Sequence, residues 1–224
     1  LRGYCSLRSQ QHAPRCTEII FQICFYMVYC REMRKFRLCR TSCRKHYGKP
    51  ERKNTMNIRK STRQDLSEIL NLYKIAREFM KNNGNPNQWE DRYPEVSTVE
   101  SDISQGISYV CEENGRIVGT FVFFIGEEPD YAVIEEGNWR CEQKPYGVIH
   151  RVASDGQTKG VTREAFTWGL EKSGYLRIDT HRDNRPMQGA LKKFGFQKCG
   201  IIHLKRGGER IGFDCISAES GKKK

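Results

Sequence analysis

Apolar residues return at helical spacing after Asp65. This spacing predicts an amphipathic helix whose apolar face lies in a core. The repeating positions are Leu66, Ile69, Leu70, Leu72, Tyr73, Ile75, Ala76 and Phe79. Similar patterns predict three more helices, over Val99–Gln105, Thr162–Lys172 and Arg185–Phe194, and Gly195 follows the last of them as a helix-ending residue.

Shorter apolar runs, bounded by turn-forming residues, predict the strands of a sheet. They are Asn57–Lys60, Ser108–Glu112, Ile117–Ile125, a run that begins at Val148, Tyr175–Thr180, Gly200–Lys205 and Arg210–Ile216. Asn114-Gly115 predicts a hairpin turn between the second and third strands, and Gly207-Gly208 turns the last hairpin. This mixture implies an α/β or α+β domain with a twisted, mostly antiparallel mixed sheet of about six to seven strands flanked by helices.

A polar, glycine-containing loop connects the strand that begins at Val148 with the helix that begins at Thr162. Such a loop directs unpaired backbone N–H groups and a helix N-terminus at one point, which suits a pyrophosphate. Gly160 permits a phosphate to approach the backbone closely, and Lys159 adds a positive charge. Taken alone, the same loop is equally consistent with an ordinary strand-to-helix connection.

A second pattern, further along the chain, favours the pyrophosphate-binding interpretation of this loop. Ile178 to Asn184 reads as a strand and a polar turn that lead into an amphipathic helix. With both patterns present, the chain resembles the GNAT superfamily of acyl-CoA-dependent N-acyltransferases. The loop of that family reads Gln or Arg, two residues, Gly, one residue, then Gly or Ala. Here Gln157 to Val161 fit the pattern, and Thr162 is a mild departure from it.

The resemblance covers the chain from Met56 to Ile216 and implies a V-shaped cofactor cleft in the sheet. It implies that the loop holds the pyrophosphate of acetyl-CoA, and that an open strand edge and an asparagine hold the pantetheine arm. The residues assigned to this cosubstrate are Arg151, Val152, Gln157, Thr158, Lys159, Gly160, Val161, Thr162 and Asn184. The implied reaction is direct attack of a primary amine, of a small molecule or peptide, on the acetyl thioester, aided by a backbone N–H near Val152.

The proton-transfer groups are less well defined than the cofactor groups. Many family members carry a tyrosine as the acid four residues before the glycine that closes the final helix, but this chain has Leu191 there. The candidates for the acid that protonates the departing thiolate are then water and Cys199. For the base we expect His150, whose ordinary pKa suits the task, or Glu135 beside Glu136. The structural alternatives are a hydrogen-bonded histidine and a solvated acidic loop.

Aromatic residues in irregular segments are the candidates for acceptor binding. Trp89 and Tyr93 lie in or beside a loop rich in turn formers, and Trp139 lies in the segment from Glu127 to Tyr146. They can form a binding wall, or they can simply cover the core. The first half of that segment is acidic, which favours a cationic amine acceptor unless the charges are only a solvated surface.

Composition separates a basic leader, residues 1–55, from a domain, residues 56–219, and a short basic tail, residues 220–224. The leader has thirteen Lys or Arg against three Asp or Glu, so it carries most of the formal net charge of +12. Six of the ten cysteines also lie in it. We expect this leader to be non-native upstream sequence or disordered, with Met56 as the natural start.

The leader offers little evidence for a membrane or metal partner. Its apolar run from Ile19 to Cys30 is too short to span a bilayer, and Cys39, Cys43 and His46 lack a usual zinc spacing. We expect no nucleic-acid partner and, without a targeting signal, a cytoplasmic location. A homodimer is consistent with the family. Two alternatives stay open: a non-catalytic acyl-CoA-binding module, and a nucleic-acid-binding protein that uses the basic leader.

Overall fold

The computed structural model describes residues 56–89, 92–142 and 145–217. All of the site residues proposed from sequence lie within these ranges. The expectations for the leader, residues 1–55, and for the tail, residues 220–224, lie outside the described residues, and so do Cys39, Cys43 and His46. None of the described helices is long and apolar enough to cross a membrane.

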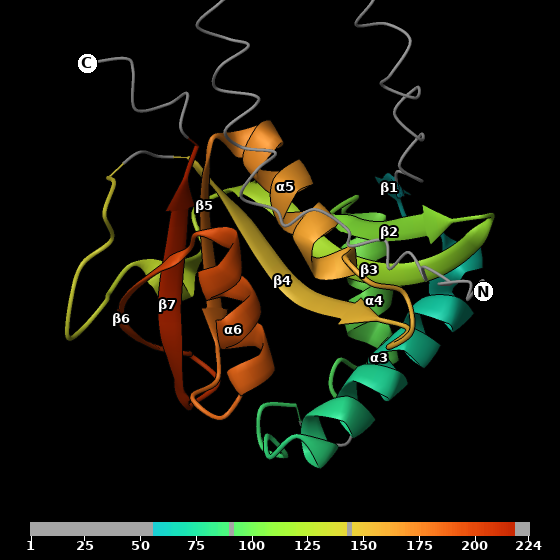
Figure 1. Ribbon diagram of the computed structural model, residues 1–224, viewed down its shortest axis with the longest axis horizontal. Helices are drawn as coiled ribbons and strands as arrows, with labels where there is room; N and C mark the ends of the chain where they lie inside the picture. Colours follow the sequence, from blue (N-terminus) through green and yellow to red (C-terminus); the bar gives the residue numbers. More distant parts are fainter. Residues whose placement is uncertain (1–55, 90–91, 143–144, 218–224) are drawn as a thin grey trace, which may run out of the picture. The chain divides into compact units, whose positions relative to one another are not determined.

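Seven strands of the described chain form one sheet with the order β1-β2-β3-β4-β5-β7-β6. Every neighbouring pair is antiparallel except β4 and β5, which are parallel. This mixed but mostly antiparallel sheet confirms the predicted fold class (Figure 1). The strands are β1 Asn57–Lys60, β2 Ser108–Glu113, β3 Arg116–Gly126, β4 Tyr146–Ser154, β5 Tyr175–Thr180, β6 Gln197–His203 and β7 Glu209–Ile216.

Four α-helices in the described ranges flank the sheet, and all four were predicted. They are α3 Leu66–Asn82, α4 Val96–Ser104, α5 Val161–Ser173 and α6 Arg185–Phe194, with short 3-10 turns η2 Arg63–Asp65 and η3 Pro129–Tyr131. α4 begins earlier than Val99, the start that its apolar pattern predicts. The reason is that Glu95 takes the extended backbone of an N-cap, with φ −69° and ψ 158°, so helical geometry starts directly after it.

The two faces of the sheet carry separate cores. In β2, Val110 packs in a cluster with Ile69 and Leu72 of α3, whereas its neighbour Cys111 packs in a cluster with Ala165 of α5. Because successive side chains of a strand point to opposite faces, α3 and α5 cover opposite faces of the sheet. α6 contributes to the same core as α5. The sheet is thus held from both sides.

β4 and β5 pair at only two positions, Gly147 with Leu176 and Val148 with Arg177. Beyond Val148, β4 follows β3 and β5 follows β7, so the two central strands run apart (Figure 1). A register shift between β3 and β4 adds to the bend of β4. The sheet therefore has an open strand edge in its middle, which corresponds to the V-shaped opening that the family resemblance implies.

Candidate functional site

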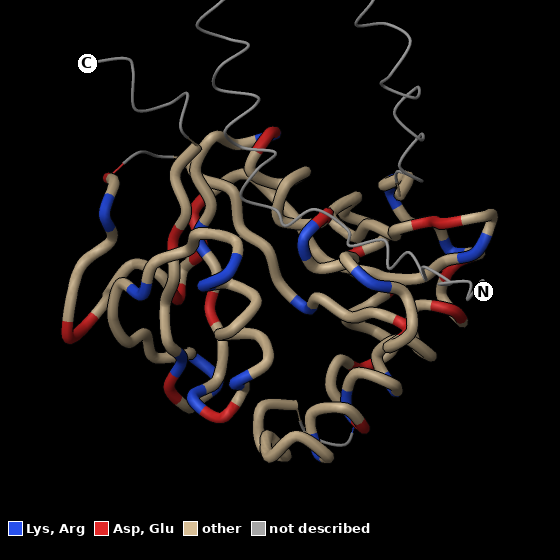
Figure 2. The backbone as a smooth tube through the Cα atoms, viewed as in Figure 1, with Lys and Arg blue, Asp and Glu red and all other residues tan. Residues whose placement is uncertain are grey.

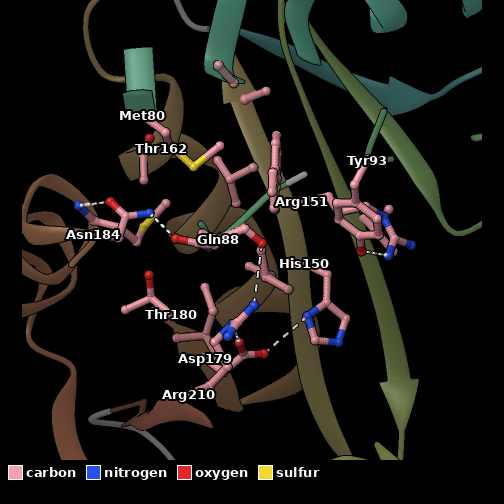
Figure 3. A pocket seen from close by; sticks show the side chains of 18 of the residues that line it. Met80, Gln88, Tyr93, His150, Arg151, Thr162, Asp179, Thr180, Asn184 and Arg210 are labelled. Atoms are coloured by element: carbon pink, nitrogen blue, oxygen red, sulfur yellow. Dashed lines mark hydrogen bonds and ion pairs between the residues drawn. The ribbon is translucent and has the colours of Figure 1, made fainter. Parts of the chain in front are cut away.

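A cavity of about 720 Å³ lies where β4 and β5 diverge. Its wall combines these strands with the β4–α5 loop, the start of α6, and the α3–α4 and β6–β7 loops. Figure 3 shows side chains from these segments around one space, so a single cavity joins the expected cofactor loop to the expected acceptor loop. It contains most of the predicted site residues: Trp89, Tyr93, His150, Arg151, Val152, Thr158, Thr162 and Asn184.

The middle of β4 leaves regular strand geometry at Arg151, whose φ of 52° lies in the left-handed region. The register with β3 shifts at this point, so that Arg151 and Val152 together oppose Phe121. Such a β-bulge takes backbone N–H and C=O groups out of the ladder. Because β5 has already diverged, the backbone at the bulge lies against the cavity rather than against another strand.

The Arg151 side chain ties this bulge to α4. Its Nη2 donates to both carboxylate oxygens of Asp102, at 2.8 and 2.7 Å, and its Nη1 donates to the Tyr93 hydroxyl at 3.2 Å. Burial raises the pKa of Asp102, and the charge of Arg151 opposes that rise. The side chain thus positions both the bulge and the Tyr93 loop, while the strained backbone of Arg151 stays at the cavity.

The loop from Asp155 to Gly160 is held by its own first residue. The Asp155 carboxylate accepts the N–H groups of Gln157 and Thr158, at 3.0 and 2.8 Å, and the Thr158 hydroxyl at 2.9 Å. Gly160 begins α5 with a φ of 93° and no side-chain cap, and no atom lies within 4 Å of where its Cβ would stand. The first N–H groups of α5 have no partner within the helix, so this end of the cavity suits an anion.

The remaining loop residues contribute in different ways. Thr158 and Thr162 line the cavity, whereas Gln157 and Lys159 are exposed and do not. Val161 is 2% exposed because its side chain packs in the core, which leaves only its backbone for a ligand. The geometry fits a diphosphate at the start of α5, and the exposed Lys159 adds a positive charge to this loop.

Asn184 begins α6 and connects it with the α3–α4 loop. Its side-chain oxygen accepts the Met187 N–H at 3.1 Å, as an N-cap does, and its Nδ2 donates to Gln88 Oε1 at 2.8 Å. Gln88 also accepts from Asn85 Nδ2 at 2.7 Å, so it links the two segments (Figure 3). A carboxamide has two N–H groups, which leaves Asn184 one further donor at the cavity wall.

His150 lies between two carboxylates. Its Nε2 is 2.9 Å from Glu128 Oε2, and its Nδ1 is 3.6 Å from Asp179 Oδ2 (Figure 3). The hydrogen bond with His150 lowers the pKa of Glu128, so this carboxylate is ionised at neutral pH. The contact with Glu128 orients the imidazole ring, and Asp179 lies on its other side. All three residues line the cavity.

Other cavity residues went unnoticed in the sequence. The Tyr131 hydroxyl donates to Asp179 Oδ2 at 2.9 Å, and Arg210 Nε lies 3.8 Å from Asp179 Oδ1. Thr180 ends β5 beside them and pairs with Ile211 of β7. No local motif marks these residues, because the pairing of β5 with β7 brings them together from distant segments.

Glu135 and Trp139 do not line the cavity. The Glu135 carboxylate is exposed and lies 3.1 Å from His203 Nε2, and its backbone pairs with β6. Trp139 Nε1 donates to the Tyr131 carbonyl at 3.1 Å, and the ring packs against the Arg177 guanidinium, 4.5 Å from the ring centroid. Neither position supports the role expected from sequence, because both residues brace the segment that follows β3.

Trp89 and Tyr93 line the cavity and also pack against neighbouring rings. Trp89 is 8% exposed and meets Tyr73 and Tyr93 edge to face, at centroid distances of 5.6 and 5.9 Å. The Arg206 guanidinium lies 4.3 Å from the Tyr93 ring centroid. Trp89 therefore belongs to the core and to the cavity wall at once, and its contact with the acceptor stays a prediction.

The positions considered for a general acid are buried away from the cavity. Leu191, where many family members have a tyrosine, is 0% exposed and belongs to the core shared by α5 and α6. Cys199 does not line the cavity, and burial raises the pKa of its thiol to about 11. Neither position therefore supplies an acid at the cavity.

Comparison with known proteins gives a consistent result at the level of structure. No protein-family model matches the chain, and no curated protein matches it. Two solved structures, each 17% identical, agree with it in fold alone. A GNAT-family acetyltransferase from Listeria monocytogenes 4b F2365 has a TM-score of 0.52 and covers 72% of this chain and 94% of its own. A ribosomal-protein-alanine N-acetyltransferase from Brucella melitensis has a TM-score of 0.50 and covers 71% and 99%.

A third structure is more closely related in sequence. This GNAT-family acetyltransferase from Streptococcus agalactiae 2603 is 32% identical, with a TM-score of 0.66. The alignment covers 72% of this chain and 95% of the Streptococcus chain, so the likeness extends over nearly all of the Streptococcus protein. Together with the divergent central strands and the glycine-containing loop at α5, this identity shows that the chain belongs to the GNAT family of acetyltransferases.

Proposed function

We propose that this protein transfers the acetyl group of acetyl-CoA to a primary amine of a small molecule or peptide. The observation that carries the proposal is the divergence of β4 and β5 along one cavity, which reaches from the start of α5 to His150. An anion site at one end and a proton-accepting pair at the other are the two features that this reaction needs within one space. Family membership supports the acetyltransferase part of the proposal.

Five of the nine cofactor residues expected from sequence line this cavity, which supports a position for acetyl-CoA along it. The start of α5 at Gly160 and Thr162 offers N–H groups to the diphosphate. The open edge of β4 at Arg151 and Val152 offers backbone groups to the pantetheine amides, as a neighbouring strand would. Asn184 offers its remaining N–H from the opposite wall. Bound there, acetyl-CoA supplies the thioester carbonyl that the acceptor attacks.

The protein must remove a proton from the ammonium form of the acceptor before the nitrogen can attack. We assign this proton to the His150–Glu128 pair, because the imidazole Nε2 lies 2.9 Å from the carboxylate and both residues line the cavity. A backbone N–H near Val152 polarises the carbonyl that is attacked. None of the four cysteines in the described ranges lines the cavity, which agrees with direct attack without an acyl-cysteine intermediate.

Calorimetry of acetyl-CoA binding to the full chain tests the cofactor half. We expect a sub-millimolar dissociation constant, and we expect Gly160→Glu to abolish binding, because it places a carboxylate at the diphosphate end. Gly195→Glu is the matched control. Gly195 also has a left-handed φ, 118°, and open space around its Cβ position, but it follows the C-terminus of α6, whereas Gly160 precedes the N-terminus of α5. No binding by the folded parent would refute the proposal.

The buried Leu191 favours one alternative, a module that binds acyl-CoA without turnover, because the tyrosine that many family members use as an acid is missing. Both functions predict acetyl-CoA binding. Only the transferase predicts that release of the CoA thiol depends on an added amine, and a thiol reagent measures this directly. A cytoplasmic location, a homodimer and the lack of a nucleic-acid partner remain predictions.

A further inference from the structure

Arg210 is a buried cation at the acceptor side of the cavity. It lies near the start of β7, is 8% exposed, and lines the wall beside Asp179 and Thr180 (Figure 3). Burial lowers the pKa of its guanidinium from the ordinary value, and Asp179 offsets that effect only in part. A guanidinium stays protonated in proteins even so. The fold therefore maintains a desolvated positive charge at this wall.

The protein does not use the full hydrogen-bonding capacity of Arg210. Its Nη1 donates to the Glu209 carbonyl at 2.8 Å, and its Nη2 makes only a long contact of 3.4 Å with the Gln88 carbonyl. Its carboxylate neighbour, Asp179, lies 3.8 Å from Nε, which is longer than a charge-assisted hydrogen bond. Arg151, by contrast, meets its carboxylate partner at 2.7 Å. Arg210 can therefore bind a further anion.

Two more groups on the same wall suit an anion. Arg206, on the β6–β7 loop, also lines the cavity. Thr180 is 0% exposed, and its hydroxyl has no hydrogen-bond partner among the described residues. A buried hydroxyl without a partner is destabilising, and a ligand that supplies an acceptor removes that cost. Two cations and an available donor thus lie around one part of the cavity.

The carboxylates of the cavity are already engaged. Glu128 pairs with His150, Asp130 accepts the Lys205 N–H at 3.1 Å, and Asp179 accepts a tyrosine hydroxyl. Lys and Arg, like Asp and Glu, occur on many segments of the described backbone (Figure 2), although the segment between Arg116 and Arg140 holds five carboxylates and no Lys or Arg. Because the cavity carboxylates already have partners, they give little support to the expectation that the acidic segment after β3 selects a cationic amine acceptor.

We propose that the acceptor is an amine that also carries a carboxylate, such as an amino acid, and that Arg210 binds this carboxylate with the help of Arg206 and Thr180. The inference rests on the proposed function, because it names the class of amine that enters the same cavity. A planar guanidinium matches a carboxylate with two parallel hydrogen bonds. The amine end of the acceptor lies toward His150, with Asp179 between the two ends (Figure 3).

Paired acceptors test this assignment in the full chain supplied with acetyl-CoA. Each standard amino acid is compared with its α-amide, and spermidine and putrescine serve as amines without a carboxylate. We expect an acid to be preferred over its amide in kcat/KM, and Arg210→Gln to reduce that preference about 10- to 100-fold. Arg210→Lys keeps the charge and part of the preference. Thr180→Val removes only a hydroxyl, so it causes a smaller loss.

An amino acid and its α-amide differ in the basicity of their amino groups, which alone changes kcat/KM. This difference is the same for every variant, so we compare the ratio of kcat/KM for acid and amide between the variants. Arg182→Gln is the control, because Arg182 is exposed, pairs with Glu209 and does not line the cavity. It should leave the preference unchanged. Amides or polyamines that react as well as the acids, or a preference that survives in both Arg210→Gln and Thr180→Val, would overturn the inference and leave the proposed function standing. If no amine reacts although acetyl-CoA binds, both proposals fail.

Discussion

His150 is the residue on which the proposed proton transfer depends. It contacts Glu128 at 2.9 Å and lies 3.6 Å from Asp179, so the ring is held in one orientation beside the bulge. The hydrogen bond with His150 lowers the pKa of Glu128, which keeps this carboxylate ionised to a lower pH than an ordinary glutamate. Because the proposed step needs a group that is free to accept the proton of the ammonium, we expect activity to be higher on the alkaline side and to fall in acid.

His150→Gln keeps a polar side chain but cannot take up a proton near neutral pH. We expect kcat/KM to fall about 100-fold and the acid limb of its pH profile to be lost. His203→Gln is the control, because His203 is exposed, pairs with Glu135 and does not line the cavity. The measurement is kcat/KM against pH at saturating acetyl-CoA. Full turnover by His150→Gln at every pH would exclude His150 from the proton path.

Two of the candidate site residues stand where a loop leads into a helix, and the sequence predicted both of these positions. Gly160 and Asn184 each stand at the start of a helix, and such positions have a local sequence pattern. The partners of His150 could not be predicted in this way. Glu128 follows β3 and Asp179 lies within β5, so only the assembled sheet brings them to one histidine.

One glycine in α5 and one in α6 differ in how closely other atoms pack around them. A Cβ on Gly169 of α5 would lie 2.8 Å from Ile149 Cδ1 on β4. A Cβ on Gly189 of α6 would meet no atom within 4 Å. Gly169 is buried and Gly189 is exposed. The absence of a side chain at Gly169 therefore lets α5 pack closely on the strand that carries the bulge.

We expect Gly169→Val to lower the free energy of unfolding by about 1–3 kcal/mol, because the larger side chain overpacks the contact with Ile149. Gly189→Ala is the matched change at an open helical position. It should raise the free energy of unfolding by about 0.4–1 kcal/mol, since it restricts the unfolded chain without a clash. Urea unfolding, followed by tryptophan fluorescence, measures both. An unchanged or raised stability of Gly169→Val would contradict close packing of α5 on β4.

Most elements were predicted with bounds close to those observed, and the exceptions have physical causes. β5 and α6 have the expected bounds. β6 was expected over Gly200–Lys205 but spans Gln197–His203, because it is an edge strand. Its first residues, Gln197 and Lys198, are exposed, so the apolar pattern starts late. The divergence of β4 and β5 was expected only from the family resemblance, since neither strand encodes it alone.

Across the molecule, the cavity joins parts of the sheet that hold each other weakly. β4 and β5 meet at only two residue pairs, and the Gln88–Asn184 hydrogen bond links the α3–α4 loop to α6. A ligand along the cavity contacts both sides of the opening. Because it binds the folded state and not the unfolded chain, it stabilises the fold by mass action. A substitution at the α5 end of the cavity should therefore reduce the stabilisation by acetyl-CoA, whereas a substitution at the acceptor end should not.

We expect acetyl-CoA at 100 times its dissociation constant to stabilise the fold by about 2.7 kcal/mol. For a domain of this size, that corresponds to a rise in Tm of roughly 5–11 °C in scanning calorimetry. Gly160→Glu should lose this rise, because it alters the diphosphate end at α5. Arg210→Gln should keep it, because Arg210 lies at the acceptor end. Loss of the rise in Arg210→Gln would mean that the two ends are coupled, and its persistence in Gly160→Glu would place the diphosphate away from α5.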